Sequence, residues 1–131
     1  SIMANGTIAF DTLQTSGQID GTARSIDTDY LLMGSAKAWL QHNQSHAIQD
    51  SFNFTSITDG GTGLTSDATF TNVLVNDDYA VSGNGGTTTN DDGFWSLTAI
   101  ATTDFNVRCR THNGNLNDSD NACLLAHGEL A

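Results

Sequence analysis

Several residue types are scarce or missing in this 131-residue chain, and each shortage narrows what the protein can be. Proline is absent, cysteine occurs twice, and Glu129 is the single glutamate. Basic residues number four against 15 acidic ones, which gives a formal net charge of −11. Because nucleic-acid binding needs clustered Lys and Arg to neutralise phosphate groups, we expect no nucleic-acid partner.

Long apolar segments are missing as well. No apolar run reaches the roughly 20 residues of a membrane-spanning helix, so we expect no membrane insertion. The apolar fraction of 37% is low for a globular protein. A chain of this length can nevertheless bury about two thirds of its unfolded surface in one domain. Near the N-terminus, Met3 to Gly6 resembles a native start, which would leave Ser1 and Ile2 outside the natural sequence.

The sequence does contain short runs in which apolar and polar residues alternate, separated by Gly, Asn and Asp. Alternation with a period of two predicts strands that bury one face. The runs lie at 8–12, 36–40, 52–57, 68–73, 79–81, 95–100, 105–109 and 122–126. They predict an all-β fold, an antiparallel β-sandwich (jelly-roll-like) of about eight strands.

The segments between these runs predict turns and one boundary. Glycine pairs at 60–61 and 85–86 are expected to reverse the chain, because glycine adopts positive φ. The polar run 111–121 is expected to be the loop of a long hairpin between two apolar strands. Residues 1–35 are predicted to form an N-terminal arm that anchors or trimerises the chain, and residues 36–131 to form the sandwich domain.

Four short segments after residue 35 occur in an informative order. They are Ala36-Lys37-Ala38-Trp39, Asp50-Ser51-Phe52-Asn53, Ser56-Ile57-Thr58-Asp59-Gly60-Gly61-Thr62-Gly63 and Asp78-Tyr79-Ala80-Val81-Ser82-Gly83. In this order they resemble the C-terminal module of tail-fibre and tail-tip proteins of tailed bacteriophages, many of them marine. The resemblance covers residues 36–130. It departs at Val75-Asn76-Asp77, where the family often has an apolar-Pro-Asp step.

The resemblance implies a structural virion protein that is usually a homotrimer and contacts other virion proteins. It implies a place at the tail tip or fibre, with loops 41–49, 84–94 and 112–121 facing a glycan or protein of the host cell surface. The alternative is a capsid decoration or head-fibre protein on the capsid surface, and a non-viral carbohydrate-binding module is a third interpretation. We expect no enzyme, because neither a Gly-x-Ser-x-Gly elbow nor a phosphate-binding glycine motif occurs.

Candidate ligand-binding residues lie in two of these polar loops. They are Asn90, Asp91 and Asp92 in loop 84–94, with Trp95 directly after it, and His112 and Asn113 in loop 112–121. An aromatic side chain beside flexible polar groups can contact a sugar or a protein. The alternative for Trp95 is a place in the core or at a subunit interface, and Trp39 is assigned to core or trimer packing.

Two pairs of residues are candidate metal ligands. His42 and His46 are four residues apart and could share a transition metal, although they bracket a predicted turn, which favours exposed loop histidines. Asp118 and Asp120 offer the oxygen ligands that Ca²⁺ prefers, and ordinary Asx turns explain these residues equally well. Beyond these metals we expect no cofactor.

Cys109 and Cys123 flank the polar run 111–121. Antiparallel pairing across that run would bring them opposite each other, and a disulfide closing such a loop would stabilise the fold by roughly 3 kcal/mol. The alternative is two reduced thiols, as expected for a protein assembled in a reducing cytoplasm. Their spacing fits neither a Cys-x-x-Cys redox site nor a four-ligand zinc site.

Overall fold

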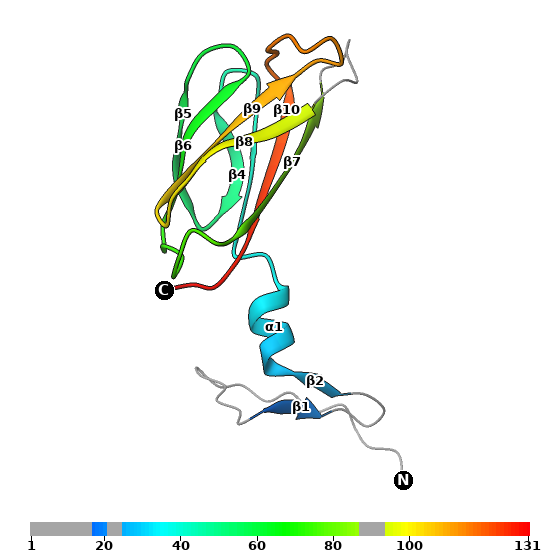
Figure 1. Cartoon of the computed structure of the whole chain (residues 1–131), viewed down its shortest axis with the longest axis vertical. Helices are drawn as coiled ribbons and strands as arrows, with labels where there is room; N and C mark the ends of the chain where they lie inside the picture. The colour runs from blue at the N-terminus through cyan, green and yellow to red at the C-terminus, as the bar shows by residue number, and fades with distance from the viewer. Residues whose placement is uncertain (1–16, 21–24, 87–93) are drawn as a thin grey trace.

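The computed structural model describes residues 17–20, 25–86 and 94–131, most of which form two packed sheets (Figure 1). The first sheet has the order β4 (Ile48–Phe52), β3 (Ala38–His42), β10 (Asn121–His127), β7 (Ala80–Gly86). The second has the order β5 (Phe54–Asp59), β6 (Leu64–Phe70), β9 (Asp104–Arg110), β8 (Phe94–Ile100). Every pairing within them is antiparallel. The predicted antiparallel β-sandwich of about eight strands is confirmed.

A small hairpin and a helix precede the sandwich. The hairpin pairs β1 (Gln18–Asp20) with β2 (Ser25–Asp27), and α1 (Thr28–Gly34) follows directly. Figure 1 shows both elements extending away from one end of the sandwich, the end that also holds the C-terminus. They belong to the segment predicted as an arm, whereas the predicted strand at 8–12 lies outside the described residues.

Large aromatic residues of the second sheet fill the core against small residues of the first. Phe54, Phe70 and Phe105 form a cluster with ring centroids 5.2 to 5.8 Å apart. Ala38 and Ala126 of the first sheet are fully buried. Pairing large with small side chains lets two twisted sheets fill the space between them.

Tyr79 closes this core at the end near α1. Its ring packs 5.6 Å from that of Phe70, and its hydroxyl donates hydrogen bonds to the carbonyls of Ala101 (2.9 Å) and Asp104 (3.0 Å). Burial, and then the negative charge of Asp104, raise the pKa of Tyr79 to about 12. The side chain therefore stays neutral and supplies an apolar body with a satisfied polar tip.

The alternating run at 52–57 is divided between the two sheets, which corrects the prediction of a single strand. Asn53 has a φ of 59° and turns the chain from β4 into β5. As a result Phe52 is 54% exposed on the outside of the first sheet, whereas Phe54 is buried in the core. The expectation that both phenylalanines face the same way was wrong, because a left-handed residue between them breaks the period of two.

Two predicted reversals had opposite outcomes. The turn at 60–61 is confirmed: Gly61 has a φ of 104°, and the amide of Gly60 donates to the carbonyl of Leu64 at 2.9 Å. The pair at 85–86 lies inside β7, so the predicted reversal there was wrong. A Cβ on Gly85 would lie 2.6 Å from the carbonyl oxygen of Asn121, so glycine serves close strand packing at this position.

Candidate functional site

Three loops gather at the end of the sandwich opposite α1, which we call the distal end (Figure 1). They are the β3–β4 loop at 43–47, the β5–β6 turn at 60–63 and the β9–β10 connection at 111–120. The first and third largely coincide with the predicted recognition loops 41–49 and 112–121, whose remaining residues belong to the adjoining strands. The structure therefore brings two of the predicted loops to one surface.

Hydrogen bonds fix the β9–β10 connection against its neighbours. Asp118 accepts a hydrogen bond from the backbone amide of Gly63 at 2.6 Å. The Ser119 hydroxyl and the Asp120 amide both donate to the carbonyl of Gly86, at 3.1 and 3.0 Å. These bonds link the β9–β10 connection to the β5–β6 turn and to the end of β7, where the predicted recognition loop 84–94 begins.

A single glycine allows this close approach. Gly63 has a φ of +67°, and a Cβ there would lie 2.6 Å from the carbonyl oxygen of Cys109 and 2.7 Å from the amide nitrogen of Asn117. Both neighbours are backbone atoms and cannot rotate away. Gly63 is therefore needed where the turn packs under the β9–β10 connection.

Asn43, Gln44, Ser45 and Asp120 line a shallow depression of about 370 Å³ on the distal end. The Asn43 side-chain oxygen accepts hydrogen bonds from the amides of Ser45 and Ala47, both at 3.0 Å. This Asx-type turn holds the rim of the depression in one conformation. The surface thus offers polar groups on a fixed backbone.

His42 and His46 are buried beneath this surface, so the expectation of exposed histidines was wrong. His42 is 2% exposed at the end of β3, and the His46 side chain is 5% exposed. Their rings stack with centroids 4.9 Å apart. His46 Nδ1 lies 3.4 Å from Asp59 Oδ1, a contact that becomes ionic when His46 is protonated.

The predicted metal sites are not assembled among the described residues. No three His, Cys, Asp or Glu side chains there are grouped to hold an ion. His42 uses both ring nitrogens on Asn43 and Thr65, and Asp118 uses a carboxylate oxygen on Gly63. These side chains organise the loops.

The predicted binding residues have different environments. His112 and Asn113 are exposed in the β9–β10 connection, on the distal end. Trp95 points between the sheets, packs against the core and has its ring centroid 6.5 Å from that of His42, which agrees with the core alternative. Asn90, Asp91 and Asp92 lie outside the described residues.

The two cysteines lie on strands of different sheets, so the predicted hairpin between them is wrong. Cys109 on β9 faces the core and is buried, and Cys123 on β10 faces outward. Both are free thiols, which agrees with the alternative of two reduced cysteines rather than with a disulfide. Burial, and then the charge of Asp118, raise the pKa of the Cys109 thiol, which makes it a poor nucleophile.

Sequence reasoning missed one exposed surface. Trp39 was assigned to core or trimer packing, and a place in the core was wrong, because it is 38% exposed on the outer face of the first sheet. Its strand neighbours Ala38 and Leu40 are buried, which by alternation places Trp39 outside. That alternation is visible in the sequence and predicts the outer position.

Comparisons with protein-family models, with curated proteins and with solved structures found no match. Among the described residues, no helix is long and apolar enough to cross a membrane.

Proposed function

We propose that this chain is a structural virion protein of a bacteriophage, a tail-fibre or tail-tip domain whose distal end contacts the host surface. The observation that carries the proposal is the position of the loops. Loops 43–47 and 111–120 share the end of the sandwich farthest from α1, where they surround the depression lined by Asn43 and Asp120 (Figure 1). A recognition domain requires this separation between the surface that is presented and the end that is attached.

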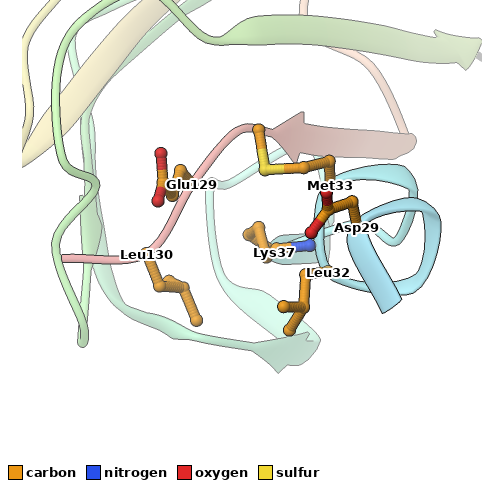
Figure 2. A pocket seen from close by; sticks show the side chains of 6 residues that line it. All are labelled: Asp29, Leu32, Met33, Lys37, Glu129 and Leu130. Carbon is orange, nitrogen blue, oxygen red and sulfur yellow. The ribbon is translucent and has the colours of Figure 1, made fainter. Parts of the chain in front are cut away.

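The end of the molecule that includes α1, opposite the distal end, exposes apolar side chains as an interface without its partner would. The helix α1 has no buried residue, and Tyr30, Leu32 and Met33 are 77%, 62% and 52% exposed. Leu32 and Met33 line a pocket of about 290 Å³. Figure 2 shows them beside Lys37 and Leu130 from the base of the sandwich. Apolar side chains exposed in this way indicate contact with other copies or other virion proteins.

The resemblance of residues 36–130 to tail-fibre and tail-tip modules supports the same function. A homotrimer presenting three distal ends would gain avidity, because linked weak sites multiply through effective concentration. The negative charge of −11 keeps such an exposed particle soluble.

The proposal is tested on virions that carry this protein. Immunogold labelling with antibodies to the chain should mark the tail tip, and the purified full chain in excess should slow adsorption of the virions to host cells. A matched variant with Asn43→Ala and Gln44→Ala in the depression should compete less well, whereas Val73→Ser at the opposite end should compete normally. Labelling confined to the head would overturn the proposal and support capsid decoration.

A further inference from the structure

The outer face of the first sheet carries a row of apolar side chains that crosses three strands. Trp39 on β3 pairs in register with Phe52 on β4, and Leu125 on β10 pairs with Trp39 on its other side. Residues directly opposite each other in antiparallel strands point to the same face. Phe52 and Trp39 are 54% and 38% exposed, and Leu125 is partly buried. We call Phe52, Trp39 and Leu125 the aromatic row.

The core does not need this row. The inward side of the same strands is completed by Ala38, Leu40 and Leu124, which are at most 2% exposed. Exposed apolar residues scattered singly over a surface are ordinary. Two aromatic side chains and a leucine in one register, however, form a continuous strip of about 10 Å across three strands.

Polar side chains that can form hydrogen bonds border the aromatic row. Ser82 on β7 continues it, because Leu125 pairs with Ser82. The neighbouring row on the same face consists of Asp50, Gln41, Cys123 and Asn84, which are paired across the four strands. Asp50 carries the only charge in these two rows, and neither row contains a cation.

We propose that this face binds a neutral oligosaccharide, with sugar rings packed on Trp39 and Phe52 and hydroxyl groups hydrogen-bonded to Gln41, Asp50 and Asn84. Sugar rings have apolar faces and polar edges, and an aromatic platform beside amide and carboxylate groups matches both. The inference rests on the proposed host-surface function and names a ligand class and a surface away from the distal loops.

Charge and composition distinguish this ligand from other occupants. An acidic saccharide or a nucleic acid would meet Asp50 and a chain of net charge −11 with no cation in either row. A second copy of the chain would bury the polar row and bring like charges together. Contacts between copies suit α1 better, where residues 30–33 carry no charge.

The experiment applies the full chain to an array of neutral and acidic bacterial-surface oligosaccharides, and then measures affinity for the bound ones by titration. Neutral oligosaccharides should bind and change tryptophan fluorescence, because Trp39 is exposed. Trp39→Ala and Phe52→Ala should each weaken binding about tenfold or more, as expected for central aromatic contacts. Trp39→Tyr should retain part of the affinity.

The matched control is Leu97→Ala, which removes an apolar side chain that is 45% exposed on the other sheet, outside the predicted loops. This variant should bind normally. The inference is overturned if no neutral oligosaccharide binds, if Trp39→Ala and Leu97→Ala bind equally, or if Trp39→Ala instead reduces self-association in light scattering. If the chain still slows virion adsorption in any of these cases, the proposed function stands without the saccharide surface.

Discussion

The imidazole of His42 has a defined neutral tautomer because its two partners differ in kind. Nδ1 lies 2.8 Å from the carbonyl oxygen of Asn43, which can only accept, so Nδ1 carries the proton. Nε2 lies 3.1 Å from the Thr65 hydroxyl, which can then donate to it. Burial lowers the pKa of His42 below 6.5, and nearby His46 lowers it further, whereas the Asn43 hydrogen bond and Asp118 raise it.

This environment makes the stability of the distal end depend on pH. Because the pKa of His42 is lower in the folded than in the unfolded state, the unfolded state binds more protons below pH 6.5. The free energy of unfolding should be highest above pH 6.5. It should decrease as the pH drops from 6.5 through the lower pKa that His42 has in the folded state. Ring-proton NMR should give the lowered pKa, and urea unfolding between pH 7.5 and 5.5 should show the loss.

The control for this prediction changes a histidine in a different environment. His42→Gln should flatten the pH dependence, whereas His112→Gln, in the exposed part of the β9–β10 connection, should keep it. Both variants keep Asp59 and Asp118, so the comparison isolates the change of histidine. Equal slopes for His42→Gln and the parent chain would contradict the assignment.

At the scale of elements, Asn53 decides how two strands are divided between the sheets. Its side-chain nitrogen donates to the carbonyls of Lys37 (3.1 Å) and Asn72 (3.0 Å), and its side-chain oxygen accepts from the amide of Asn72 (2.7 Å). Its φ of 59° is a conformation that asparagine and glycine adopt most readily. The residue thus fixes both the turn and the contact between the neighbouring loops.

Substitutions at Asn53 should separate these two contributions. Asn53→Gly keeps the backbone conformation and loses the four side-chain hydrogen bonds of Asn53, at a cost of about 2 kcal/mol in the free energy of unfolding. Asn53→Ala loses the same bonds and adds about 1 kcal/mol of left-handed strain. Urea unfolding should therefore rank alanine below glycine. The same pair at exposed Asn113 should differ little, and a more stable Asn53→Ala would disprove the account.

The period of two was enough to predict the sandwich but not the path of the chain through it. Alternation identified Ala38 and Leu40 as one face of a strand, because burial on one face requires that pattern. It could not show that the chain passes from one sheet to the other at Asn53, because asparagine is also common at a strand end or in an ordinary turn. Gly85 was misassigned for a related reason: glycine also occurs where another backbone comes close, and that neighbour is 36 residues away at Asn121.

The candidate site was predicted as loops, and the structure adds an exposed apolar face of the first sheet. His112 and Asn113 are exposed on the distal end as polar loop residues should be. The exposure of Trp95 could not be predicted from the sequence. It depends on which face of the sheet the side chain occupies at this position of β8, and the preceding loop residues have no alternating pattern that would assign the face. Likewise, the burial of His42 follows from partners such as Thr65, 23 residues away, which a local pattern cannot show.

At the scale of the whole molecule, α1 has no buried residue in the part of the chain that the structure describes. Residues 30–33 are consecutive and apolar, so at 3.6 residues per turn their side chains point around the whole helix. A helix that is apolar on every side is normally buried, and a seven-residue helix is not stable alone in water. A single partner would bury one side of α1, whereas several copies of the chain packed around a common axis would bury several sides of each helix at once.

The full chain should therefore be a trimer in solution, held together through α1. Light scattering after size exclusion should give three times the mass of 13.8 kDa. Tyr30→Gln with Leu32→Gln keeps good helix formers at both positions while removing apolar surface, so this variant should dissociate to monomers. Tryptophan fluorescence should stay unchanged, because both tryptophans lie in the sandwich and no core residue of the sandwich is altered.

Leu116→Gln provides the matched control, since it removes an apolar side chain that is 38% exposed in the β9–β10 connection, far from α1. That variant should remain trimeric. A parent chain that is monomeric at micromolar concentration, or a Tyr30→Gln, Leu32→Gln chain that stays trimeric, would show that α1 does not hold the copies together. Because avidity at the distal end requires several copies held by the opposite end, the same substitutions should also reduce competition with virions for host cells.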